Sequence, residues 1–281
     1  MGGSVDRRTI IAVFVWLAVF FLLIARPLSA QEPGTWAPVA VLNQPRSEHT
    51  STLLADGRTL LVGGRDGSGR ALATAELFDP ATPGAYGRVA GILPVAVWSH
   101  AATRLDDGMV LIVGGIGDGG LPVAAAQLFD PVAGRFTALA PLRTPRVQHT
   151  ATRLPDGRVL VAGGTDGTVA LATLELYDPA TRTFSAGGVL AVPRQAHTAT
   201  LLPDGRVLIA GGANTAGALS VAELCDPRTG TVAMAGALNV ARTRASASAL
   251  TTGLRPKSAS RGMAERWPCR RTMSRSSSRL G

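Results

Sequence analysis

The chain has 281 residues, of which 46% are hydrophobic and 17% are charged, and this composition excludes a disordered protein because it can bury a sizeable core. The formal net charge of +9 belongs to the ends: residues 1–30 carry +2 and residues 254–281 carry +7. The body between them is neutral. A neutral body excludes a basic groove, so we expect no nucleic-acid partner.

The first 30 residues are typical of an export signal. Arg7 and Arg8 precede an apolar run over residues 10–25, and residues 28–30 then offer a cleavage site before Gln31. We therefore expect a secreted, periplasmic or cell-surface protein. The length of the apolar run leaves open an uncleaved membrane anchor, through which alone the chain would contact a membrane.

Residues 31–253 contain a tandem repeat that occurs four times and stops early in a fifth copy. Its first marker is a histidine that recurs at steps of 51, 49 and 48 residues, at His49, His100, His149 and His197. Its second marker is a glycine pair that recurs at the same steps, at Gly63/Gly64, Gly114/Gly115, Gly163/Gly164 and Gly211/Gly212. Two independent markers with one period indicate a repeat architecture.

Each copy predicts four short strands. A strand that begins at the histidine is followed by an Asp-Gly pair, which favours a tight hairpin turn. The second strand is nearly all apolar, as expected for a strand buried on both faces, and it ends at the glycine pair. An Asp-Pro turn separates the third strand from the fourth. In the third copy we expect these strands at residues 149–154, 158–162, 174–177 and 184–190.

Four antiparallel strands in a period near 50 residues are typical of a β-propeller blade. The glycine pairs, the acidic-apolar-aromatic-Asp-Pro pattern of the third strand and the aromatic residue opening the fourth resemble the kelch family over residues 35 to about 250. The patterns Arg-x-x-His-Thr and Asp-Gly-Arg-Val-Leu resemble its bacterial form. The resemblance extends to the central propeller domain of galactose oxidase, and it implies an all-β, kelch-type β-propeller.

The two ends of the repeat array predict an incomplete or open ring. Residues 35–40 look like a fourth strand without its three predecessors, which a propeller uses to complete its last blade. The fifth copy keeps Arg242 but has Ala245 at the histidine position. We therefore expect four complete blades, an orphan N-terminal strand and a broken fifth blade, with self-association possible through the open blade edges.

Residues 254–281 predict a basic, disordered tail that is rich in Arg and Ser. The composition changes abruptly after Gly253. This change also fits a shifted reading frame, which would make the chain a truncated fragment of a larger propeller.

Seven residues are candidate ligand contacts: Arg46, Arg146, Arg194, His49, His100, His149 and His197. Guanidinium groups at a channel mouth would hold acidic or sugar ligands through bidentate bonds, although Val97 breaks the arginine series in the second copy. The histidines would form a ring that binds a metal or an anion. The alternative is a repeated structural role, in which each arginine pairs with an acid of a neighbouring blade at Glu76, Glu175 or Glu223. We favour that role for the histidines and predict no metal site and no cofactor.

Two further motifs are better explained by the repeat. Gly115, Gly117 and Gly120 match a dinucleotide-binding pattern, but a predicted strand follows them where that site needs a helix. Cys225 takes an aromatic position of the third strand, so we expect a small buried side chain.

The sequence contains no catalytic constellation. Galactose-oxidase-like enzymes rely on tyrosines, a cross-linked cysteine and histidines around copper, whereas Tyr86 and Tyr177 hold framework positions here. We expect an exported, non-enzymatic scaffold that binds a protein or glycan through the loops after the glycine pairs, such as residues 65–70 and 116–121. The alternative is the propeller portion of a carbohydrate-active or galactose-oxidase-like enzyme whose catalytic residues are missing here.

Overall fold

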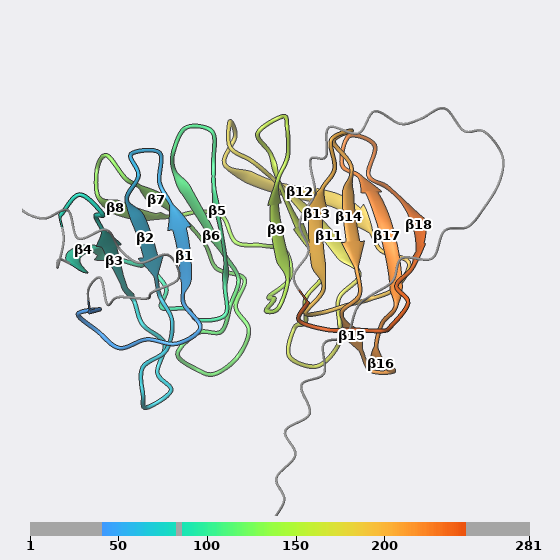
Figure 1. The fold of residues 1–281 in the computed structure, drawn as a ribbon, viewed down its shortest axis with the longest axis horizontal. Helices are drawn as coiled ribbons and strands as arrows, with labels where there is room; N and C mark the ends of the chain where they lie inside the picture. Colours follow the sequence, from blue (N-terminus) through green and yellow to red (C-terminus); the bar gives the residue numbers. More distant parts are fainter. Residues whose placement is uncertain (1–40, 83–85, 246–281) are drawn as a thin grey trace, which may run out of the picture. The chain divides into compact units, whose positions relative to one another are not determined.

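The computed structural model describes residues 41–82 and 86–245 (Figure 1). These residues form strands, turns and loops, and they include no helix long and apolar enough to cross a membrane. The predicted export signal, the orphan strand at residues 35–40 and the basic tail lie outside the described residues.

The described residues form four antiparallel sheets of four strands, each with its strands in chain order, and we number these sheets as blades 1 to 4. This arrangement confirms the all-β prediction of four strands per repeat. Blade 1 contains β1 (Thr50–Leu53), β2 (Thr59–Val62), β3 (Thr74–Phe78) and β4 (Tyr86–Ile92). Blade 2 contains β5 (Ala101–Arg104), β6 (Val110–Val113), β7 (Ala126–Asp130) and β8 (Arg135–Ala138). Blade 3 contains β9 (Thr150–Arg153), β10 (Val159–Ala162), β11 (Thr173–Asp178) and β12 (Thr183–Val189). Blade 4 contains β13 (Thr198–Leu201), β14 (Val207–Ala210), β17 (Val221–Asp226) and β18 (Thr231–Ala237), with a small hairpin of β15 (Ala213–Asn214) and β16 (Gly217–Ala218).

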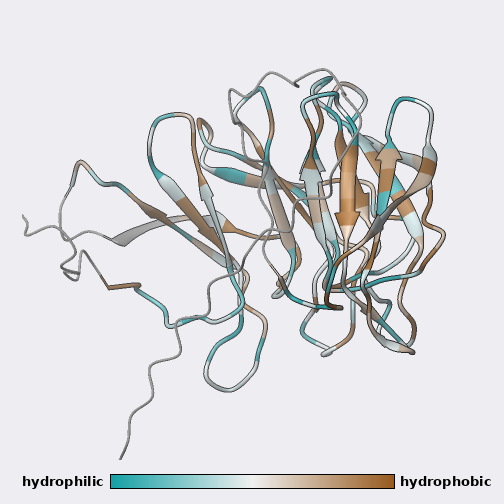
Figure 2. Cartoon of the chain, turned by 45° about the vertical axis from the view of Figure 1, so that its right-hand side comes forward, coloured by the Kyte–Doolittle hydropathy of each residue, from teal (hydrophilic) through white to brown (hydrophobic). Residues whose placement is uncertain are grey.

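The second strand of each blade is its apolar centre. β6 and β10 are buried at every position, because a neighbouring blade covers each of their faces. Between blades 1 and 2, for example, Leu60 and Val62 share a core with Val110, Ile112 and Phe129. Figure 2 shows the corresponding brown, apolar stretches along the strands. Face-to-face packing of such blades is what the apolar second strands predict.

The Asp-Gly pairs form the predicted hairpin turns between the first and second strands. Their glycines have φ between +84° and +86°, a region that favours glycine. The aspartate caps the turn in three blades by accepting the backbone N–H of an arginine two residues later, and Met109 takes the place of that arginine in blade 2. These turns lie together on one side of the blades, which we call the hairpin face.

The glycine pairs fasten neighbouring blades together. We call the four residues that end at each histidine position the leading segment of a blade: residues 46–49, 97–100, 146–149, 194–197 and, after blade 4, 242–245. The second glycine of each pair donates its backbone N–H to the first carbonyl of the following leading segment at 2.9 Å: Gly64 to Val97, Gly115 to Arg146, Gly164 to Arg194 and Gly212 to Arg242. A Cβ on the first glycine would lie only 2.3–2.7 Å from that same carbonyl. No other residue fits so close a backbone approach.

The chain after blade 4 has the geometry of a fifth leading segment. The bond from Gly212 to Arg242 is in place, and Arg244 has the positive φ that Glu48, Ser99, Gln148 and Ala196 share at the equivalent position. Arg242 itself is exposed, in contrast to the buried Arg146 and Arg194. The repeat therefore continues to Ala245, where the description of the chain ends.

Replacing Gly114 by Ala is expected to weaken the junction between blades 2 and 3. Gly114 has φ of +61°, and its Cβ would lie 2.5 Å from the Arg146 carbonyl and 2.6 Å from Cε1 of His149. We expect a loss of about 1–3 kcal/mol in the free energy of unfolding from backbone strain, with the clash adding to it. Urea denaturation measures the loss. Gly119→Ala is the matched control, since no atom lies within 4 Å of its Cβ position; an equal loss in both variants would refute the close-approach argument.

Candidate functional site

The three arginines predicted as ligand contacts form buried ion pairs. The Nη2–Oε1 distances are 2.6 Å for Arg46–Glu76, 2.5 Å for Arg146–Glu175 and 2.6 Å for Arg194–Glu223. Their guanidinium side chains have no exposed surface. The acids are those expected from the sequence, but each lies on the third strand of the same blade. The expectation of a neighbouring blade is wrong because the leading segment folds back over its own sheet.

Each guanidinium directs its other donors into its own blade as well. In blade 3, Nη1 of Arg146 donates to the carbonyls of Gly163 at 2.9 Å and Thr173 at 3.1 Å. Oε2 of Glu175 accepts the backbone N–H of Arg143 at 2.9 Å. The same network recurs in blades 1 and 4. This geometry supports the structural alternative, in which the ion pair anchors the leading segment.

Blade 2 replaces this ion pair by a neutral pair. Val97 takes the arginine position with no exposed surface, and Gln127 takes the glutamate position with 1% exposed. The Gln127 amide accepts from the Val95 N–H at 2.9 Å and donates to the Val95 carbonyl at 3.0 Å. Both charges are absent together, so no buried charge is left without a partner.

The histidines lie at the junctions between blades. His100, His149 and His197 are 6–9% exposed, and His49 is partly buried. Where a threonine follows the histidine, its hydroxyl bonds to Nε2 of the next blade's histidine: Thr50 to His100 at 2.7 Å and Thr150 to His197 at 3.1 Å. This arrangement supports the packing role. Among the described residues, no group of three or more His, Cys, Asp and Glu side chains is placed to hold a metal ion.

His149 differs from its equivalents because Ala101 stands where Thr50 and Thr150 stand in their blades. Neither ring nitrogen of His149 has a hydrogen-bond partner, although the Val113 carbonyl lies near the ring. An imidazole in such surroundings resists protonation.

Burial lowers the pKa of all three buried histidines, to about 4 for His100 and about 3 for His149 and His197. The charges of Arg146 and Arg194 lower the pKa of His149 and His197 further. These three rings are therefore neutral at physiological pH and act as packing groups.

One exposed group of polar and aromatic side chains lies at the junction of blades 1 and 2, and we call Glu48, Arg65, Trp98 and Ser99 the junction cluster. The Arg65 guanidinium lies 4.7 Å from the centre of the Trp98 ring and 2.6 Å from the Glu48 carboxylate. The Ser99 hydroxyl donates to the other oxygen of Glu48. The side chains of Arg65 and Glu48 are 40% and 36% exposed. Cation–π contact and ion pairing thus hold charged groups at the surface.

The sequence predicted only part of this cluster. Arg65 begins one of the predicted binding loops, whereas Glu48, Trp98 and Ser99 belong to leading segments and were missed. A signal was present: the position of Trp98 is occupied by Ser47, Val147 and Gln195 in the other copies. A repeat position that changes in every copy is free of the packing constraint that fixes the glycines.

The loops after the glycine pairs of blades 1 and 3 are ordered by their own aspartates. Oδ1 of Asp66 accepts the backbone N–H groups of Ser68 and Arg70, and Oδ1 of Asp166 accepts those of Thr168 and Val169. These bonds lower the pKa of Asp166 to about 2. A loop that is ordered before binding loses less conformational entropy when it binds. These loops and the junction cluster form the loop face.

The blades and their junctions define a β-propeller repeat protein. Residues 146–188 match the family model of the Kelch motif. YjhT, a solved kelch-type β-propeller, is similar with a TM-score of 0.64 over 76% of this chain and 78% of its own, at 14% sequence identity. No curated protein matches the sequence. The motif match and the shared architecture identify a kelch-repeat β-propeller fold.

Glu175→Gln is expected to lower the free energy of unfolding by about 3–5 kcal/mol, because it leaves the buried Arg146 charge without a partner. The double variant R146V/E175Q reproduces the neutral pair that Val97 and Gln127 form in blade 2. We expect it to recover about half of the loss or more, since replacing a buried ion pair costs less than breaking it. Chemical denaturation of the two variants decides: a double variant no more stable than E175Q would contradict the pairing argument.

The free energy of unfolding is expected to fall as the pH drops below 6.5. Unfolded histidines bind protons near pH 6.5, whereas His100, His149 and His197 in the folded protein bind them only near pH 3–4. Between these values the unfolded state holds more protons, so stability is complete above pH 6.5 and is lost progressively on acidification. Denaturant unfolding between pH 7.5 and 5 measures the slope. His149→Gln should reduce that slope by about one proton; an unchanged slope would count against a neutral buried His149.

Proposed function

We propose that this protein is an exported, non-enzymatic scaffold that binds a protein or a glycan through its loop face. A kelch propeller is a binding scaffold or a propeller domain, and this much rests on the fold. The choice of the loop face and of a binding role rests on a contrast between two sets of polar residues: the repeated ones are buried in the blades, and those of the junction cluster are exposed.

The observation that carries the proposal is the junction cluster. The framework arginines direct their donors into the blades, whereas Arg65 and Glu48 keep more than a third of their side-chain surface exposed. Tryptophan and arginine are the residues that most often dominate binding energy at protein interfaces. A tryptophan held under an arginine by a glutamate offers a ligand an ordered aromatic and charged surface.

The non-enzymatic part of the proposal is supported by the state of the groups that could do acid–base chemistry. His100, His149 and His197 are buried and neutral, and Glu76, Glu175 and Glu223 are bonded to arginines. The repeated aspartates accept backbone N–H groups in turns. Export is supported by the arginine pair and apolar run in residues 7–25.

Screening the full chain against a glycan array and a displayed peptide library tests the proposal. We expect ligands whose affinity falls about tenfold or more in Trp98→Ala and Arg65→Ala, in line with the loss of a hot-spot residue. Val132→Ala is the matched control, because Val132 is 96% exposed on the hairpin face and its loss should change nothing.

Two outcomes would overturn the proposal. Ligands that bind equally well to the loop-face variants would place the binding surface elsewhere. Turnover of a bound glycan by the wild-type chain would favour the alternative, a carbohydrate-active or galactose-oxidase-like enzyme. Thermal unfolding of each variant separates loss of binding from loss of fold.

A further inference from the structure

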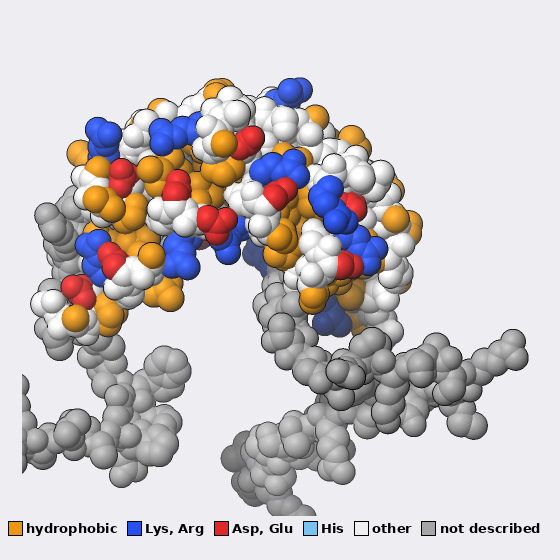
Figure 3. Space-filling model, turned by 90° about the horizontal axis from the view of Figure 1, so that it is seen from above, with side chains coloured by type: hydrophobic (Ala, Val, Ile, Leu, Met, Phe, Trp, Pro, Cys, Tyr) orange, Lys and Arg blue, Asp and Glu red, His pale blue; other side chains and the backbone are white. Residues whose placement is uncertain are grey.

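The hairpin face has clefts between neighbouring blades. The clefts on either side of blade 3 are each bounded by the hairpin turns of two blades and the Asp-Pro turn of the second, whereas the cleft between blades 1 and 2 is lined by outer-strand residues of blade 1 and the Asp-Pro turn of blade 2. Their volumes are about 190 Å³ between blades 1 and 2, about 360 Å³ between blades 2 and 3, and about 230 Å³ between blades 3 and 4. Figure 3 looks onto this face and shows arginine and acidic side chains next to one another. Because the two clefts on either side of blade 3 are built from equivalent residues, differences between these two are informative.

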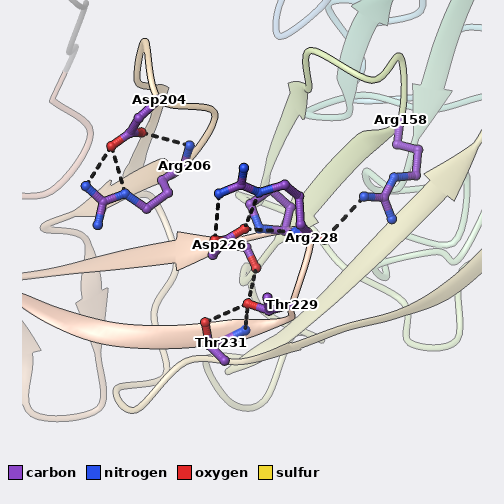
Figure 4. Close-up of polar contacts among 8 residues, drawn as sticks. Arg158, Asp204, Arg206, Asp226, Arg228, Thr229 and Thr231 are labelled. Atoms are coloured by element: carbon purple, nitrogen blue, oxygen red, sulfur yellow. Dashed lines mark hydrogen bonds and ion pairs between the residues drawn. The ribbon is translucent and has the colours of Figure 1, made fainter.

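In the cleft between blades 3 and 4, an arginine of the chain reaches across. Nε of Arg158 donates to Oδ2 of Asp156 at 2.9 Å. Nη2 of Arg158 donates to the carbonyl of Pro227 on the next blade at 3.3 Å, and Figure 4 shows this arginine and its bond across the cleft. The acid and the carbonyl together form a receptor for a guanidinium group, which the chain fills itself. Charge-assisted bonds of this kind are stronger than neutral ones.

In the cleft between blades 2 and 3, the receptor is present and the arginine is not. Asp107 and Pro179 take the places of Asp156 and Pro227, but Met109 takes the place of Arg158. The Asp107 carboxylate accepts the backbone N–H of Met109 and has no ion-pair partner among the described residues. The volume of this cleft is also larger than that of the equivalent cleft between blades 3 and 4, as expected where a long side chain is missing.

A second, independent feature distinguishes the same cleft. Tyr177 takes a position held by Phe129 and Cys225 in the adjacent blades, and it packs with Leu105, which lines the cleft. Its hydroxyl is buried and has no hydrogen-bond partner. Burial raises the pKa of Tyr177; the charge of Arg182 lowers it, and the charge of Asp107 adds to the increase. A buried hydroxyl without a partner costs free energy that a ligand donor would recover.

We propose that the cleft between blades 2 and 3 binds an arginine side chain of a partner protein. The guanidinium would donate to the Asp107 carboxylate and the Pro179 carbonyl, as Arg158 does to Asp156 and Pro227. Arginine fits better than lysine because its planar donors reach two acceptors in different directions. This site lies on the hairpin face, so it is independent of the proposed ligand surface on the loop face.

The nearby arginines of the chain do not supply this group. Arg153 is paired with Asp106 at the rim of the cleft. Arg182 lies on the β11–β12 turn, where its N–H donates to the Asp178 carbonyl and its charge acts on both Tyr177 and Asp130. Arg182→Ala therefore belongs in the test, because it removes a nearby arginine whose charge already acts on Tyr177.

The probe is N-acetyl-L-arginine amide, titrated into the full chain and followed by protein-observed NMR. We expect saturable shifts in the wild type and in Arg182→Ala. In Asp107→Asn, which removes the charge of the acceptor, we expect the affinity to fall about tenfold or more. Met109→Arg is the decisive variant: it restores the residue that the equivalent turns carry at positions 58, 158 and 206, and it should fill the cleft and abolish binding. N-acetyl-L-lysine amide should bind with an affinity that is lower by about threefold or more.

Equal affinity of the wild type and Met109→Arg would overturn the proposal, as would the absence of saturable shifts in the wild type. Shifts produced by Ca²⁺ alone and blocked by Asp107→Asn would also overturn it, since they would make the cleft a cation site. Met109→Arg places an arginine where the other repeats already have one, so we expect this variant to fold as the wild type does. Thermal unfolding of the variant checks that a loss of binding is not a loss of fold.

Discussion

The close approach of each glycine pair to the following leading segment is the constraint on which the other features of this propeller depend. The bond from the second glycine joins the end of one blade's central strand to the start of the next blade. Because the backbones meet there without side chains between them, the apolar faces of the two sheets pack into a shared core. The position of every loop on the loop face follows from that contact.

The ion pairs add a second level of order. The glycine contact sets where the leading segment begins, and the buried arginine then ties that segment to the third strand of its own blade. Such pairs contribute little net stability compared with apolar replacements, because the cost of desolvating both charges offsets their attraction. The third residue of each leading segment has positive φ in every repeat, including blade 2, where no ion pair is present. Groups on the leading segments such as Trp98 therefore take their position from the glycine contact that all the repeats share.

The fold could be predicted from the sequence to a large extent, because the glycine pairs, the Asp-Gly turns and the apolar second strands each have one physical explanation. The candidate ligand contacts were predicted less well. A repeated arginine or histidine has the same pattern in the sequence whether it faces a channel or a buried glutamate, and only burial separates the two. The junction cluster had only one signal in the sequence, the variable residue at the Trp98 position, because the cluster unites residues from two blades that are not periodic. The acidic cleft likewise depends on a methionine at a place where the other repeats have arginine, and such a difference has meaning only when the facing turn is known.

The position of the ion pair within the repeat has a consequence for how the array can grow. Arg146 and Glu175 belong to the same blade, and the chain between them is continuous. A gene segment duplicated from one leading segment to the next therefore encodes both partners of the ion pair. The new blade then contains no buried charge without a partner. Blade 2 shows that the pair can later be exchanged for Val97 and Gln127 without involving either neighbouring blade. Each blade can thus diverge in its buried polar groups as a separate unit, while the glycine contacts keep it compatible with the blades on either side.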